Sequence, residues 1–252
     1  MNVGYAVLYE DGELVISKNH TLLQKKIIKD YGEFEDTNVP WKNDFNKIKK
    51  VQILDQVKST CMREWFENCI NLKTLINFKN LDVSDCTDFS YMFFNCKSLQ
   101  NLNELQNWNV SNGIDFSDMF EYCDSLQNID ALQNWNVSSG TNFSYMFSDC
   151  KSLENIDELQ SWNVSNGTDF SYMFYNCMSL QNLNGLQNWN VSNGTDFSYI
   201  FYHCNSLEEI LLSNTFKTLT KEMFELCNSK LKIYWKKHLY TYEDLLQYEE
   251  IY

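Results

Sequence analysis

The sequence predicts an α+β solenoid of about six stacked repeats, closed by a short cap at each end. Two observations support this prediction: cysteines recur with a fixed spacing of 27 residues, and the apolar residues around them recur with the same spacing. Hydrophobic residues make up 44% of the 252-residue chain, which is enough to bury a core despite a net charge of −14. A period of about 20 to 50 residues is typical of repeat arrays, so the repeat is the natural unit of description.

Three apolar columns define the repeat. A phenylalanine precedes each recurring cysteine by three residues, and a leucine follows it by three. The predicted repeat core consists of Phe66, Cys69, Leu72, Phe93, Cys96, Leu99, Phe120, Cys123, Leu126, Phe147, Cys150, Leu153, Phe174, Cys177, Leu180, Phe201, Cys204 and Leu207. One unit cannot enclose a core alone, so the units must stack, and the period predicts a leucine-rich-repeat solenoid.

Longer strings surround these columns. The string Met-Phe-x-x-Cys-x-Ser-Leu-x-x-Leu is followed by Trp-Asn-Val-Ser and then by Phe-Ser-x-Met-Phe, with Ile in place of the last Leu or of the Met in some units. These strings resemble the BspA-type leucine-rich repeats of bacterial surface proteins, protists and some mobile elements. The resemblance covers about residues 61–227, and the segment 4–14 resembles the leader strand pair of that family. It implies adhesion or protein recognition, with no catalytic residues to carry over.

The segments outside the period predict a division into three parts. We expect an N-terminal cap over residues 1–60, a repeat array over 61–230 and a C-terminal cap or tail over 231–252. Terminal caps are expected because the end repeats of an array otherwise expose their apolar faces. A recognition peptide through Tyr248 and Tyr252 is the alternative interpretation of the tail.

Local patterns predict the elements of the two caps. In the N-terminal cap, Asp11-Gly12 between two apolar runs predicts a β-hairpin, and the helical spacing of apolar residues over 21–30 predicts a helix. Residues 49–54 predict a strand that leads into the array. At the other end, residues 231–235 predict a strand, and Thr241 begins a short helix with acidic residues in its first turn.

The recurring cysteines are interpreted as a packed ladder of free thiols. Structural zinc sites use paired ligands such as C-x₂₋₄-C, and the sequence contains no such pair. Cys61, Cys86 and Cys227 lie outside the register. The three histidines form no triad or ligand set, and no Gly-rich phosphate loop occurs. The sequence therefore predicts no enzyme, no metal and no cofactor.

Two further columns invite functional interpretations that we do not favour. The tryptophans at 108, 135, 162 and 189 align with Leu81 and Phe216, which indicates a core position rather than a binding stripe. Asn-x-Ser/Thr sequons recur because the repeat copies them. We interpret their Asn and Ser residues as turn residues that bond the local backbone, not as glycosylation sites.

Charge is the feature that the fold alone does not explain. Residues 81–216 contain 17 Asp and Glu residues against Lys97 and Lys151. This excess either keeps the array soluble or serves a partner with a basic surface, whereas direct nucleic-acid binding is not expected. The candidate partner-binding residues are Asp88, Asp115, Asp169, Asp196, Glu121, Asp149 and Tyr175.

These observations favour a protein–protein interaction module. One alternative is an inhibitor encoded by a mobile element that mimics nucleic acid and blocks a basic nucleic-acid enzyme. A second alternative is a surface adhesin whose export signal is absent. The N-terminus lacks the features of a secretory signal, which predicts a cytoplasmic location, with the cell surface or secretion as the alternative. No apolar run is long enough to span a membrane.

Overall fold

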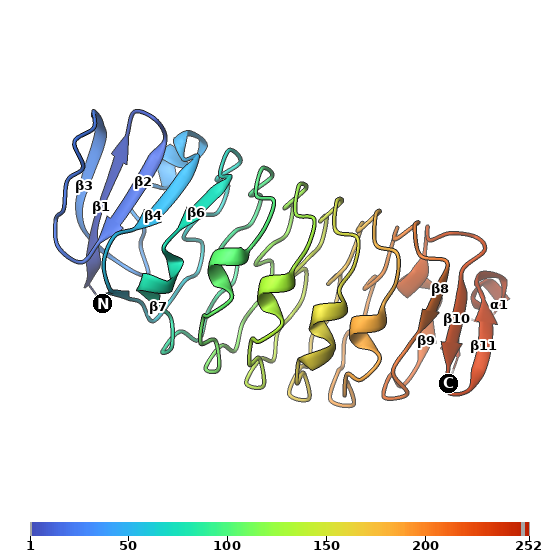
Figure 1. The fold of residues 1–252 in the computed structure, drawn as a ribbon. Helices are drawn as coiled ribbons and strands as arrows, with labels where there is room; N and C mark the ends of the chain where they lie inside the picture. The colour runs from blue at the N-terminus through green and yellow to red at the C-terminus, as the bar shows by residue number, and fades with distance from the viewer. Residues whose placement is uncertain (1, 248–249, 252) are drawn as a thin grey trace.

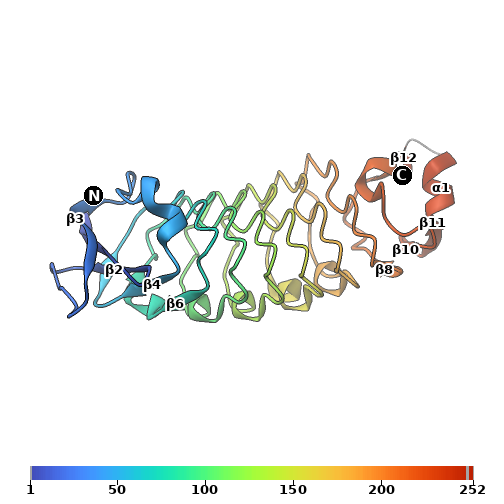
Figure 2. The same ribbon diagram turned by 90° about the horizontal axis from the view of Figure 1, so that it is seen from above.

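Successive turns of the chain lie side by side between a β-sheet at the N-terminal end and two smaller sheets at the other (Figure 1). The computed structural model describes residues 2–247 and 250–251. Seen from above, the turns form one continuous row (Figure 2). Each turn therefore packs on its neighbours in the sequence, as an array with a short repeat requires.

The N-terminal sheet has five strands in the order β3-β1-β2-β4-β6. Strands β1 (Asn2–Tyr9) and β2 (Glu13–Ser17) form an antiparallel hairpin around Gly12, whose φ of 83° suits a residue without a side chain. The parallel strands β4 (Lys50–Ile53) and β6 (Thr74–Ile76) continue the sheet into the array. The sheet thus covers the first turn of the array.

The prediction of a helix over residues 21–30 is wrong. Strand β3 (Ile27–Glu35) lies antiparallel to β1, with Tyr9 opposite Ile27. Leu22, Ile27 and Ile28 are exposed, so their helical spacing does not mark a buried face. Pairing with the open edge of β1 satisfies backbone groups along both strands, and this tertiary interaction outweighs the local pattern.

We define coils 1 to 6 as the repeat units that begin at Met62, Phe89, Phe116, Phe143, Phe170 and Phe197. The helical elements between residue 42 and residue 186 are short 3₁₀ turns: η1 (Lys42–Lys47), η2 (Phe78–Asn80), η3 (Asn103–Leu105), η4 (Asp130–Leu132), η5 (Asp157–Ser161) and η6 (Asn184–Leu186). Within the described residues, the only α-helix is α1 (Tyr242–Gln247). The fold is therefore sheet-rich with few helices, because each coil leaves too few residues between its apolar columns for a stable α-helix.

The apolar columns stack along the whole array and fill its interior. All residues of the predicted repeat core are buried. Phe120 and Phe147 lie with ring centroids 5.6 Å apart, and neighbouring phenylalanines of the same column continue the stack. Trp135 is 3% exposed and donates its indole N–H to the Leu105 carbonyl of the preceding coil, at 3.1 Å. The tryptophan column is thus a hydrogen-bonded part of the core.

The recurring cysteines are free and buried. Each thiol from Cys96 to Cys204 donates a hydrogen bond to a phenylalanine carbonyl of the preceding coil, as in Cys123 Sγ to Phe93 O at 3.3 Å. Cys227 makes the same contact with Phe201 O, at 3.1 Å. Cys227 therefore holds the same place in its coil as the other recurring cysteines, and the interpretation that it lies outside the register is wrong. The last repeat is shortened ahead of the turn that holds this thiol, so Cys227 departs from the 27-residue spacing.

The C-terminal segment carries two small sheets. Strands β8 (Glu209–Leu211), β10 (Lys232–Trp235) and β11 (His238–Thr241) form one of them, and β9 (Leu219–Thr220) pairs with β12 (Glu250–Ile251) in the other. The turn η7 (Lys221–Phe224) and helix α1 complete the segment, while β5 (Val57–Lys58) and β7 (Leu81–Asp82) pair near the N-terminal sheet. Tyr248 and Tyr252 lie outside the described residues.

Candidate functional site

The Phe-Ser-x-Met-Phe segment of each coil forms one face of the array. We call it the turn face and define it by residues 63–68, 90–95, 117–122, 144–149, 171–176 and 198–203. In coil 2, Tyr91 and Asn95 have φ values of 58° and 59°, and equivalent residues of the other coils are also left-handed. These conformations cost roughly 1 kcal/mol each for residues other than glycine. They create two consecutive tight turns in each coil.

Hydrogen bonds between coils hold these strained turns in place. The Tyr91 N–H donates to the Ser117 carbonyl of the next coil at 3.0 Å, and the Asp118 N–H donates to the Ser144 carbonyl at 2.9 Å. The same bond recurs from coil to coil along the array. Side chains on the turn face therefore project from a backbone that is fixed on both sides, which suits a rigid binding surface.

The predicted line of aspartates runs beside the turn face. Asp88, Asp115, Asn142, Asp169 and Asp196 are linked by successive parallel β-bridges. One side-chain oxygen of each accepts the backbone N–H of the serine two residues later, at 2.9 to 3.1 Å. These side chains thus close a local turn, and their contact with a partner stays a prediction.

Stacked tyrosines cover the turn face of coils 4 to 6. Tyr145 and Tyr172 lie with ring centroids 4.5 Å apart, and Tyr172 and Tyr199 follow at 5.0 Å. Beside them, Tyr175 and Tyr202 stack at 4.8 Å. All five rings are half-buried. Sequence reasoning named only Tyr175, although tyrosine at the third position of Phe-Ser-x-Met-Phe in coils 2, 4, 5 and 6 was a visible signal.

A pair of buried carboxyl groups lies on the turn face of coil 3. Asp118 and Glu121 are 8% and 7% exposed, and Ser148 Oγ donates to Glu121 Oε1 at 3.2 Å. Within the part of the chain that the structure describes, no basic side chain forms an ion pair with either group. Burial and the neighbouring Asp118 raise the pKa of Glu121 to about 9, and burial also raises the pKa of Asp118. The pair therefore retains a proton at neutral pH.

Asp149, another acidic candidate, has different surroundings. Asp149 is also buried, and the Lys151 ammonium lies 3.3 Å from its carboxylate. Sequence reasoning selected Asp149 and Glu121 because they vary between repeats, but it missed Asp118. The structure places Asp118 and Glu121 together, whereas Asp149 shares the Lys151 ammonium with Asp124.

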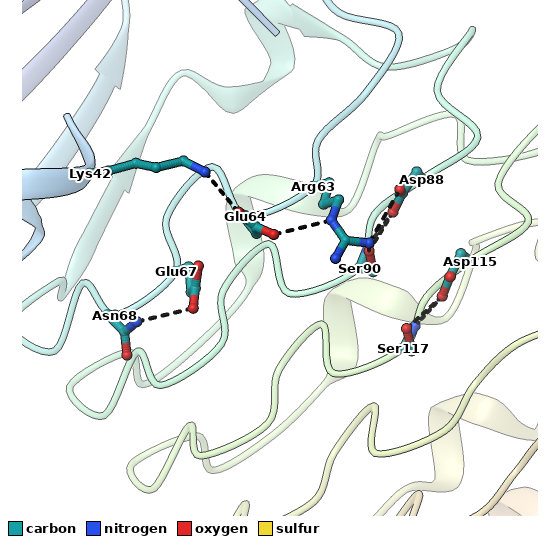
Figure 3. A network of polar contacts seen from close by, with 9 residues as sticks. All are labelled: Lys42, Arg63, Glu64, Glu67, Asn68, Asp88, Ser90, Asp115 and Ser117. Atoms are coloured by element: carbon teal, nitrogen blue, oxygen red, sulfur yellow. Dashed lines mark hydrogen bonds and ion pairs between the residues drawn. The ribbon is translucent and has the colours of Figure 1, made fainter. Parts of the chain in front are cut away.

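Coil 1 carries carboxyl groups at the same two positions, and cations lie beside the first of them (Figure 3). Glu64 and Glu67 align with Asp118 and Glu121 in the repeat. Lys42 from η1 lies 2.8 Å from one oxygen of Glu64, and Arg63 lies 3.1 Å from the other. The hydrogen bond from Lys42 is the main cause that lowers the pKa of Glu64.

Arg63 of coil 1 contacts three side chains at the boundary between coils 1 and 2. Its Nη1 donates to Ser90 Oγ at 3.2 Å and lies 3.9 Å from Asp88, while its guanidinium carbon lies 5.5 Å from the centre of the Tyr91 ring. Ser90 donates its own proton to Asp88 at 2.5 Å, so its lone pairs are free to accept. The turn face thus holds one arginine by charge, hydrogen bond and aromatic contact.

Among residues 2–247 and 250–251, no cluster of three or more His, Cys, Asp or Glu side chains is arranged to hold a metal ion. No helix in these ranges combines the length and apolar character needed to cross a bilayer. The turn face offers noncovalent contacts: aromatic area, carboxyl groups and fixed serine hydroxyls.

Three solved bacterial structures resemble the chain, all at low identity. A leucine-rich repeat protein from Bacteroides ovatus is 16% identical, with 93% of this chain and 70% of that chain covered and a TM-score of 0.45. A leucine rich cell surface protein from Faecalibacterium prausnitzii is 14% identical, with 94% and 95% covered and a TM-score of 0.26. A leucine-rich repeat protein from Eubacterium ventriosum is 11% identical, with 90% and 95% covered and a TM-score of 0.28.

The match to a family is more specific. No curated protein matches the sequence. The family described as "Mycoplasma protein of unknown function, DUF285" matches residues 34–131 and 127–216, which together make up most of the chain and nearly all of its repeats. The chain therefore belongs to the DUF285 family.

Proposed function

We propose that this chain is a protein-interaction module that binds a partner protein across the turn face of its repeat array. In this proposal, residues 61–230 form about six leucine-rich repeats of the BspA type, between caps at 1–60 and 231–252. The observation that supports the proposal is the ladder of half-buried tyrosines on coils 4 to 6, held 4.5 to 5.0 Å apart. The role requires no catalytic residue.

Tyrosine ladders suit protein recognition for two physical reasons. Each ring offers a large contact area and loses little conformational entropy on binding, so tyrosines are common among residues that dominate binding energy. Neighbouring rings already fix one another, as Tyr172 is stacked on both sides by Tyr145 and Tyr199. Binding therefore costs little further ordering.

The experiment compares two triple variants in capture of partner proteins. Tyr172→Ser/Tyr175→Ser/Tyr202→Ser removes three rings from the turn face. The control Gln106→Ser/Gln133→Ser/Gln160→Ser changes exposed residues of another column. Material from the cytoplasm and from the cell surface is tested separately, because cytoplasmic and surface locations are both open hypotheses.

A captured protein is then purified and its affinity measured with each variant. We expect the tyrosine variant to lose at least about tenfold in affinity, which corresponds to about 1.4 kcal/mol, and the control to bind like the wild type. Equal affinity of the two variants would contradict the proposal. If salt releases a basic nucleic-acid enzyme from the array, the inhibitor hypothesis is favoured over a general interaction module.

A further inference from the structure

Arg63 shows which chemical group the turn face accepts. Its guanidinium lies between Glu64 of its own coil and Ser90 of the next (Figure 3). The ring of Tyr91, also of the next coil, completes the place that holds it. Because the backbone repeats from coil to coil, the equivalent place exists wherever the repeat supplies the same three kinds of side chain. One acid, one serine and one tyrosine are required.

Coils 3 and 4 supply that combination without the arginine. Asp118 takes the position of Glu64, Ser144 that of Ser90 and Tyr145 that of Tyr91. The two residues of each pair are separated by two periods of 27 residues. The backbone φ values match: 58° at Asp118 and 57° at Tyr145, compared with 61° at Glu64 and 58° at Tyr91. The position of Arg63 itself is taken by the small Ser117.

The hydrogen-bond acceptors and one ring face are also arranged to receive a ligand. Ser144 donates its proton to Asn142 at 2.8 Å, so its lone pairs can accept, as those of Ser90 do from Arg63. Tyr145 stacks on Tyr172 through one face, and within the described residues no other ring packs on it. Asn142 replaces Asp88, which is the most distant of the polar contacts of Arg63, at 3.9 Å.

We propose that the site between coils 3 and 4 binds the guanidinium of an arginine side chain presented by a partner protein. Asp118 and Ser144 would accept its N–H groups, and Tyr145 would contact its planar face. Arginine fits better than lysine because its planar group combines several fixed donors with stacking on an aromatic ring. The inference rests on the proposed function only in assigning the arginine to a protein.

The carboxyl groups of Asp118 and Glu121, which form no ion pair within the described residues, add a second argument. Burial and proximity raise the pKa of Glu121 to about 9, and burial raises the pKa of Asp118, whereas Glu64, the counterpart of Asp118 beside two cations, has a lowered pKa. The groups around the coil 3 pair are Tyr91, Asp115, Ser117, Tyr122, Tyr145, Ser148 and Asp149. None of them is a cation, so a guanidinium would supply the missing positive charge and expel the retained proton.

The test uses N-acetyl-arginine amide as the probe and N-acetyl-citrulline amide as its uncharged isostere. We expect a saturable shift of the Tyr145 ring resonances with the arginine probe and at least tenfold weaker binding of citrulline. Calorimetry in buffers of different ionisation enthalpy should show proton release with the arginine probe. Equal binding of both probes, or no saturable shift at Tyr145, would overturn the inference.

A self-filling variant provides the matched control. Ser117→Arg places an arginine at the position of Arg63 and should abolish probe binding and raise the Tm. Ser171→Arg alters an equally buried serine, at 7% against 6% exposure, but there Tyr172 takes the position of the acid Glu64 and stacks on Tyr199. This variant should bind the probe like the wild type. If Ser117→Arg does not fold, Asp118→Asn serves instead, with an expected loss of at least tenfold.

These outcomes separate the two proposals. A partner that requires the tyrosine ladder but binds equally well to Ser117→Arg would refute the arginine site and leave the interaction module standing. Probe binding without any protein partner would support the site and leave the proposed function without support.

Discussion

Coils 1 and 3 place carboxyl groups at the same two positions of one repeat, yet at the first of these positions their surroundings shift the pKa in opposite directions. In coil 1, Lys42 and Arg63 neutralise Glu64 and lower its pKa. In coil 3, Glu121 and Asp118 are buried together, and both pKa values are raised. The repeat fixes where a side chain lies, but neighbours outside the repeat decide its charge.

The two coils also differ at the next inward position. Coil 1 has Trp65, whereas coil 3 has Met119. Trp65 lies edge-on to Phe34 and Trp41 of the N-terminal segment, with ring centroids 5.7 and 6.0 Å apart. Coil 1 thus contacts the N-terminal segment on one side, whereas coil 3 contacts neighbouring repeats on both sides.

The largest expected effect comes from making coil 1 like coil 3 in its core. Trp65→Met should lower the free energy of unfolding by about 3 kcal/mol, because it leaves a cavity and removes the indole hydrogen bond to the Asp36 carbonyl at 3.0 Å. Met119→Leu, a change of similar volume, should cost less than about 1.5 kcal/mol. Denaturant unfolding of both variants measures the difference, and equal losses would refute a special contact between coil 1 and the N-terminal sheet.

The sequence predicts the buried columns well because the same residue recurs wherever the same backbone position is buried. Phe93, Cys96 and Leu99 are examples, and their equivalents pack alike in every coil. The helix over 21–30 was predicted wrongly because strand pairing depends on β1, which local spacing does not reveal.

The candidate site was less predictable for a related reason. The sequence analysis selected recurring aspartates for their charge and passed over Tyr145 and Tyr172, which recur in the same way. The pairing of Lys42 with Glu64 joins the N-terminal segment to coil 1 and has no counterpart in the period. Asp118 and Glu121 become unusual only because such a cation is missing beside them.

The second prediction concerns the pH dependence of stability. The folded pKa of Glu121 is about 9, above its ordinary value of 4.5, so protonation stabilises the folded state. This contribution is fully present below pH 4.5 and is lost as the pH rises toward 9. Glu121→Gln resembles the protonated side chain and should be more stable than the wild type by about 1–2 kcal/mol at pH 9, with little difference at pH 4.

Glu64→Gln removes the coil 1 carboxyl group whose pKa is shifted the other way, and it should act in the opposite direction. The pKa of Glu64 is lowered, so its stabilising contribution is present above its ordinary value of 4.5 and is lost as the pH falls through its lowered folded value. The variant should be less stable than the wild type by about 0.5–1 kcal/mol at pH 7. Thermal unfolding across this pH range gives both curves, and slopes of the same sign would contradict the contrast between the coils.

The smallest expected effect comes from removing the arginine of coil 1. Arg63→Met keeps most of the aliphatic stem but loses the contacts with Glu64, Ser90 and Tyr91, and half-exposed ion pairs contribute about 0.5–1 kcal/mol. The loss should shrink at high salt, because the electrostatic part is screened. The control Lys73→Met removes an exposed lysine for which no ion pair is seen within the described residues, and it should leave stability unchanged.

If Arg63→Met also binds N-acetyl-arginine amide at coil 2, the same place accepts an external arginine once its own is gone. A stable variant that fails to bind the probe would indicate that Arg63 depends on its tether to coil 1, and would weaken its use as a guide to coil 3.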